Sequence, residues 1–165
     1  TIRGLGPELT RLVPATPITV TGGTLALESV AVTSSPGATT SVLVVDTGSL
    51  ALTDTTVHDV NATASAGSIQ LVASDLLASG VVFRGNTAVR GGHVSADGSF
   101  VELSDVRLEE GTAVSDGGGA LWMNGGTLVV RDLEAVDNTS AFDGGALRSV
   151  GATSTIRDCG WHDAA

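Results

Sequence analysis

The stretch DGGGALWMNGGTLVVRD at residues 116–132 is nearly repeated as FDGGALRSVGATSTIRD at residues 142–158. Both copies place a glycine-rich turn before segments in which apolar residues recur at every second position. A period of two is typical of β-strands, because successive side chains point to opposite faces. Short strands and turns that repeat at this spacing indicate a solenoid, in which each unit stacks on the next.

The repeat extends along the chain in a single register. One column of mostly apolar positions recurs at steps of 25, 26, 25, 27 and 26 residues, and it contains Leu25, Leu50, Leu76, Val101, Leu128 and Ser154. Four more columns follow the same steps, and they begin at Ile18, Leu27, Val30 and Val32. Each coil is therefore expected to contain three short strands, for example near residues 120–124, 126–130 and 133–136.

The composition suits stacked strands better than an irregular core. Of the 165 residues, 42% are hydrophobic but only 3% are aromatic. Small β-branched side chains fill regular layers well, whereas aromatic side chains usually fill irregular cores. The formal net charge of −10 argues against nucleic acid as a partner, since phosphate contacts need clustered basic residues. No apolar run reaches the roughly 20 residues of a membrane span.

Two motifs carry a resemblance to a known family. The first is GGA followed by an apolar residue, at residues 118–121 and 144–147. The second is phenylalanine three residues before asparagine, complete as FRGN at 83–86 and degraded as LEEG at 108–111 and AVDN at 135–138. With the opening TIRGLGPELT at 1–10, the chain resembles pectate-lyase-like parallel β-helices, in particular the repeats of polymorphic outer membrane proteins and related bacterial surface proteins.

The predicted fold class is all-β: a single-stranded right-handed parallel β-helix of about six coils, each of 25–27 residues. We expect residues 1–165 to form one domain, with residues 1–17 as a first coil or cap region and residues 18–165 as the repeats. The segment GWHDAA at 160–165 carries no cap, and an uncapped solenoid exposes apolar rungs and strand edges. We therefore expect a segment of a larger protein or assembly, whose C-terminal end is covered by further coils, another domain or another subunit.

One column contains polar or acidic residues between the second and third strands, and its members are Ser29, Asp54, Gly80, Asp105, Asp132 and Asp158. Stacked carboxylates would suit Ca²⁺, which prefers oxygen ligands. Gly80, however, has no side chain to ligate a metal. Glycine, serine and aspartate exchange most readily at a tight corner with left-handed backbone, so we interpret the column as a structural turn. Weak cation binding there stays open.

Other cofactor sites are not expected. No lysine follows the DGG turns, as a phosphate-binding Walker loop requires. The glycines are better explained by positive φ angles or by close backbone stacking. His58, His93 and His162 lie in different columns, and the single cysteine forms no CxxC motif, so a zinc site is not expected either.

Trp122 lies between inward Leu121 and Met123 and should therefore point outward from the first strand. Its column also contains Gln70, Ser95 and Arg148, and the next outward column contains Asp97 and Asn124. An exposed Trp122 beside Ser95 and Arg148 would stack on a sugar ring or contact a partner protein. The alternative is a lone tryptophan that is covered by a loop.

The resemblance implies an extracellular or cell-surface location, with outer-membrane association in a bacterium. The same solenoid carries lyases, hydrolases, adhesins and inert spacers, so fold alone does not decide the function. Our first hypothesis is a non-enzymatic, adhesin-like or structural module that presents its long faces to a partner, either a protein or a glycan at a surface. The alternative is a β-helix that binds or cleaves polysaccharide along the first-strand face. Catalysis is disfavoured because Asp46 and Asp97 are two coils apart, about 9–10 Å at strand spacing.

Overall fold

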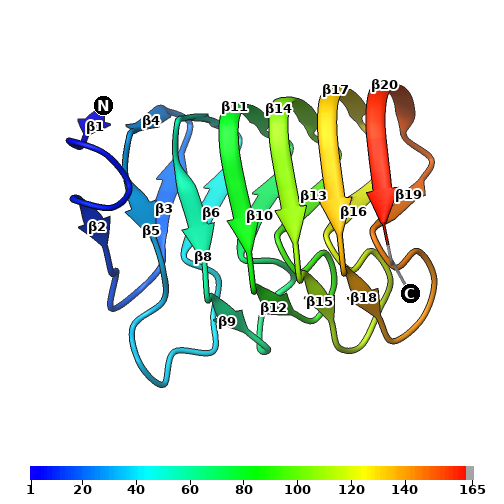
Figure 1. The fold of residues 1–165 in the computed structure, drawn as a ribbon, viewed down its shortest axis with the longest axis horizontal. Coiled ribbons are helices and arrows are strands. Elements are labelled where there is room, and N and C mark those ends of the chain that lie inside the picture. Colours follow the sequence, from blue (N-terminus) through cyan, green and yellow to red (C-terminus); the bar gives the residue numbers. More distant parts are fainter. Residues whose placement is uncertain (163–165) are drawn as a thin grey trace.

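The computed structural model describes residues 1–162, which form stacked parallel β-strands without a helix in that part of the chain. Figure 1 shows a solenoid in which each coil rises through the back, descends at the front and passes along the bottom, in a right-handed sense. The back sheet has six strands, one for each coil, so the solenoid makes about six turns. The predicted all-β parallel solenoid is confirmed.

Three sheets line the solenoid. Sheet B, at the back, consists of β3 (Ile18–Thr21), β6 (Leu43–Asp46), β10 (Ile69–Val72), β13 (Val94–Asp97), β16 (Leu121–Asn124) and β19 (Leu147–Val150). Sheet C, at the bottom, consists of β9 (Asn61–Ala62), β12 (Thr87–Ala88), β15 (Thr112–Ala113) and β18 (Thr139–Ser140). Sheet A consists of β1 (Ile2–Arg3), β2 (Arg11–Leu12), β4 (Thr24–Glu28), β5 (Ala31–Val32), β7 (Ser49–Thr53), β8 (Thr56–His58), β11 (Asp75–Arg84), β14 (Phe100–Glu109), β17 (Thr127–Val136) and β20 (Thr153–His162).

Strand pairing reproduces the columns of the repeat. Leu50 pairs with Leu25 on one side and Leu76 on the other, and the column continues through Val101 and Leu128. The predicted register is therefore confirmed along sheet A, and the same steps hold in sheet B, from Ile18 with Leu43 onward.

The strand content of a coil differs from the prediction in two ways. The second and third strands are separate in β4/β5 and β7/β8, but they merge into single ten-residue strands in β11, β14, β17 and β20. The short strands of sheet C were not predicted. They follow the polar turn after each front strand, where two residues are too few to give a periodic signal.

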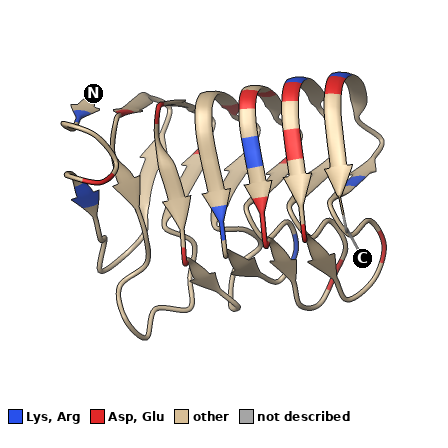
Figure 2. Cartoon of the chain, viewed as in Figure 1, with Lys and Arg blue, Asp and Glu red and all other residues tan. Residues whose placement is uncertain are grey.

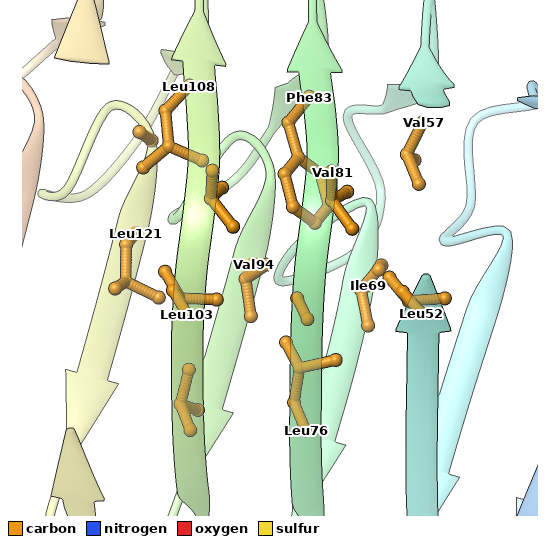
Figure 3. Packing of buried hydrophobic residues seen from close by; sticks show 14 of the residues in the cluster. Leu52, Val57, Ile69, Leu76, Val81, Phe83, Val94, Leu103, Leu108 and Leu121 are labelled. Carbon is orange, nitrogen blue, oxygen red and sulfur yellow. The ribbon is translucent and has the colours of Figure 1, made fainter. Parts of the chain in front are cut away.

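The core lies between sheets A and B and consists of like side chains stacked on like. Figure 3 shows Phe83 and Leu103 of sheet A on the same enclosed side as Ile69 and Val94 of sheet B. Phe83 and Ile69 are completely buried. Each coil thereby removes the inner face of its neighbour from water, which is the main stabilising term in a solenoid.

The sixth coil exposes core columns that are buried elsewhere. Ile156 pairs with Val130, and Trp161 pairs with Ala135. Val130 and Ala135 are buried, whereas Ile156 and Trp161 are 40% and 41% exposed. The C-terminal face of the described solenoid is thus an apolar surface with unpaired strand edges.

Within residues 1–162, no helix is long and apolar enough to cross a membrane.

Candidate functional site

The outer face of sheet B brings together the site residues that the sequence predicted. Gln70 pairs with Ser95, Ser95 with Trp122, and Trp122 with Arg148, so the four lie on consecutive coils. Asp97 and Asn124 are paired in the neighbouring column. The six residues therefore share one face, as the repeat register requires.

Trp122 is directed outward but is only 7% exposed. The guanidinium of Arg90, from the loop between β12 and β13, lies 4.0 Å from the centre of the Trp122 ring. Of the two alternatives for Trp122, the structure shows the tryptophan covered by a loop. A stacked guanidinium is a favourable cation–π contact, and it occupies the ring face that a sugar would use.

Arg148 is held by one loop residue of the preceding coil, Asp116, and by one of the loop that leads into its own strand, Asp143. Its Nη1 donates to the Asp116 carboxylate, and its Nη2 lies 4.0 Å from the carboxylate of Asp143. The Arg90–Trp122 contact follows the same pattern, since a loop residue again contacts the outer residue of the next coil. These two contacts thus join successive loops and strands at the C-terminal end of sheet B.

The carboxylates of this face do not form a catalytic pair. Asn124 Nδ2 donates to Asp97 Oδ1 at 3.0 Å. Val72 pairs with Asp46 on one side and Asp97 on the other, so it separates the two carboxylates. A water-activating pair in an inverting glycosidase needs about 6.5–9.5 Å, and two strand spacings place these groups at or beyond that limit.

The turn column has left-handed backbone in every coil. Ser29, Asp54, Asp105, Asp132 and Asp158 have φ values of 54°, 47°, 54°, 51° and 54°, and Gly80 has 63°. Residues three positions apart in a regular strand point to opposite faces. The left-handed residue Gly80 shifts this alternation by one position, so that Ala78 and Val81 of β11 are both buried in the core.

The same corner borders a shallow groove of about 620 Å³ that also contacts Arg107 and Glu134. These two side chains pair across the strands at 3.4 Å, and Figure 2 shows such mixed charges on β14 and β17. In the described part of the chain, no three His, Cys, Asp or Glu side chains gather closely enough to hold a metal ion. The polar part of its lining consists of the paired side chains of Arg107 and Glu134 and of the turn-column residues Asp54, Gly80, Asp105, Asp132 and Asp158.

The glycine-rich turns form a ladder along the loop edge of sheet B. Gly91, Gly118 and Gly144 have positive φ angles of 52°, 71° and 69°. Gly92 N–H donates to the carbonyl of Gly119 at 2.9 Å, and Gly119 N–H donates to that of Gly144 at 3.0 Å. The DGG turns are thus stacked backbone, as close packing of successive coils requires, and no phosphate is needed to explain them.

A buried polar cluster inside the solenoid was missed by the sequence reasoning. Asn86 is completely buried; its Oδ1 accepts from Val60 N–H, and its Nδ2 donates to the Val57 carbonyl, each at 2.9 Å. Nδ2 also lies 2.9 Å from His93 Nδ1. Since Nδ2 is a donor, His93 Nδ1 must be the acceptor, and the proton of the neutral ring is on Nε2.

Asn138 repeats this arrangement two coils later. It accepts from Gly111 N–H and donates to the Leu108 carbonyl, each at 2.9 Å. A Cβ on Gly111 would lie 2.8 Å from both Asn138 Oδ1 and His93 Nε2, so only glycine fits between them. The asparagines of the FRGN and AVDN segments were the available signal for this cluster, although nothing in the repeat connected them to His93.

His93 is fully buried, and its Nε2 has no hydrogen-bond partner among the described residues. Burial lowers the pKa of His93 to about 3, because the charged ring would lose its hydration; Asn138 and the Glu109 backbone offset only part of this effect. The histidine is neutral in the folded protein at pH 7.

This burial predicts acid destabilisation. Below pH 6.5 the unfolded chain binds a proton at His93 that the folded chain rejects, so the free energy of unfolding decreases as pH falls toward 3. Between pH 7 and pH 5 the expected loss from His93 is about 2 kcal/mol. Urea unfolding at both pH values would measure it, with His93→Gln expected to lose this part of the dependence. A His162→Gln control should retain it; equal pH dependence in wild type and His93→Gln would contradict the assignment.

Comparisons with family models, with curated proteins and with solved structures find no match to this chain.

Proposed function

We propose that the chain is a non-enzymatic structural and binding module of an extracellular or cell-surface protein, which presents the long faces of its solenoid to a protein partner. The observation that carries the proposal is that charged side chains on these faces are engaged with one another. Arg131 pairs with Glu102 at 3.0 Å, Arg107 with Glu134, and Arg148 with Asp116. A carboxylate that is paired with an arginine in this way is poorly placed to act as a general acid or base.

The remaining candidates for catalysis support the same proposal. Asp97 is hydrogen-bonded by Asn124, and its two neighbours in the column, Val72 and Asn124, carry no carboxylate. His93 is completely buried, so an external substrate does not reach it. The location at a cell surface, with outer-membrane association in a bacterium, is part of the proposal and rests on the sequence resemblance.

A turnover assay tests the absence of catalysis. The protein is incubated with polygalacturonate and with neutral polysaccharides, and reducing ends and unsaturated products are followed. We expect no product above that of an Asp97→Asn control. Turnover by wild type that disappears in Asp97→Asn would overturn the proposal.

Polysaccharide binding along sheet B is the second candidate. It rests on the shared outer column of Gln70, Ser95, Trp122 and Arg148, and it requires Arg90 to leave the Trp122 ring, because Ser95 and Trp122 are both buried. A glycan array with wild type and Trp122→Ala distinguishes the two functions: the scaffold function predicts no tryptophan-dependent signal. A glycan retained by wild type and lost by Trp122→Ala would favour the second candidate.

We also propose that further coils, another domain or another subunit covers the C-terminal face. Ile156 and Trp161 are exposed there in columns that every neighbouring coil buries. The isolated 165-residue chain should therefore self-associate, and Ile156→Lys should reduce the association. Size-exclusion chromatography with light scattering would measure both. A stable, soluble monomer at high concentration would contradict this proposal.

A further inference from the structure

Two buried donors without acceptors belong to one stacked pair on the outer face of sheet B. Trp122 Nε1 and Arg90 Nε are both buried, and neither has a hydrogen-bond partner within residues 1–162. Trp122 itself is only 7% exposed. These two donors are closed to an external acceptor, but Arg90 as a whole is only half-buried, and its two Nη groups are neither buried nor hydrogen-bonded within the described residues. An acceptor can therefore approach the stacked pair through the Nη groups of Arg90.

Arg90 differs from the other arginines of the described chain. Ion pairs with Glu or Asp engage Arg3, Arg107, Arg131 and Arg148, whereas Arg11, Arg84, Arg90 and Arg157 form none among the described residues. What sets Arg90 apart from the other three is its contact with Trp122. Without an ion pair, the guanidinium of Arg90 lies over the Trp122 ring, with its central carbon 4.0 Å from the ring centre. The stack restrains a side chain that otherwise loses much rotamer freedom on binding.

We infer that Arg90, oriented by Trp122, anchors a carboxylate of a protein partner. The inference rests on the proposed function of a protein-binding module and names the contact through which it binds. A planar guanidinium offers two parallel N–H groups that match the two oxygens of a carboxylate. Arginine beside tryptophan is also a combination enriched at the centres of protein interfaces.

The stack favours an acidic side chain over a sugar. Carbohydrate recognition by tryptophan uses an open ring face, and Arg90 covers the ring of Trp122. The chain carries a formal net charge of −10 and therefore repels an acidic partner at long range. The attraction between the Arg90 guanidinium and a carboxylate must therefore act at short range. At about 0.15 M ionic strength, repulsion from charges farther than roughly 8 Å is largely screened.

Titration with labelled hexaglutamate tests the inference at that ionic strength. Fluorescence anisotropy of the peptide reports affinity, and in a Trp161→Phe background the intrinsic fluorescence reports Trp122 alone, since the chain has two tryptophans. We expect saturable binding with a change in Trp122 emission and no binding of hexaglutamine. Arg90→Gln should weaken binding at least tenfold, and Arg90→Lys should weaken it several-fold because the forked geometry is lost.

Arg84→Gln is the matched control, because Arg84 lies on β11, on another face, and is exposed. It should bind like wild type, and circular dichroism should show that all variants are folded. No saturable binding, or equal losses in Arg84→Gln and Arg90→Gln, would overturn the inference. Arg90-dependent binding of trigalacturonate without binding of hexaglutamate would overturn the protein partner in favour of an acidic glycan. The turnover assay does not involve Arg90, so a failure of the proposed function can be distinguished from a failure of this inference.

Discussion

Replacing Gly119 with alanine should abolish the stable folded state. A Cβ at this position would overlap the carbonyl oxygens of Gly145 and Thr139, which are backbone atoms of the next coil. Neither oxygen moves without separating the stacked turns, where Gly119 N–H bonds to the Gly144 carbonyl and the Ala120 and Leu121 N–H groups bond to the Ala146 carbonyl. Severe overpacking destabilises by about 3 kcal/mol or more, a large share of the stability of a small domain.

Urea unfolding followed by circular dichroism measures this effect. Gly23→Ala is the matched control, because the nearest atom to its Cβ would be the Thr21 carbonyl oxygen at 3.9 Å. The control should unfold within about 1 kcal/mol of wild type, since alanine also restricts the unfolded chain. If Gly119→Ala is as stable as Gly23→Ala, close stacking of the DGG turns does not require glycine at position 119.

Asn86→Ala should destabilise the protein by about 3–6 kcal/mol. The substitution removes the partners of Val60 N–H, the Val57 carbonyl and His93 Nδ1 together. Each is left in the interior without water, and a buried unsatisfied group costs about 1–3 kcal/mol. Denaturant unfolding at pH 7 would measure the loss.

Two comparisons separate the contributions of this cluster. Asn138→Ala removes the same kind of backbone contacts, to Gly111 N–H and the Leu108 carbonyl. It should cost less, because the amide 2.9 Å from His93 Nδ1 belongs to Asn86 and is retained. Asn61→Ala changes an exposed residue and should stay within about 0.5 kcal/mol of wild type. Equal stability of Asn86→Ala and Asn61→Ala would show that the buried amide of Asn86 does not stabilise the turn after β11.

The path of the solenoid was largely predictable because the pattern that specifies it lies within each short strand and recurs along the sequence. Alternation within each strand identifies the inward residues, and the common steps of the columns align Leu50 with Leu76 and Trp122 with Arg148. In a solenoid each coil contacts only its neighbours, so register along the sequence becomes register in space. The corner at Asp54 and Gly80 was equally readable, because few residues tolerate left-handed backbone.

The candidate site was only partly predictable. The column of Gln70, Ser95, Trp122 and Arg148 follows from the register, but the cover that Arg90 places over Trp122 does not. Loop side chains are not periodic, and Arg90 contacts a residue of the next coil. The enclosure of His93 by Asn86 and Gly111 is of the same kind, since no spacing rule connects these positions.

By itself, the sequence determined that the chain is a parallel solenoid, which residues face its interior and which outward residues share a column, because these properties depend on period and register alone. The tertiary structure decided which polar groups are satisfied and which are covered. It encloses His93 beside an amide, pairs Arg148 with Asp116, and stacks Arg90 on Trp122 without an acidic partner in the described chain. Those outcomes depend on burial and on contacts between loops of different coils, which are properties of the folded molecule.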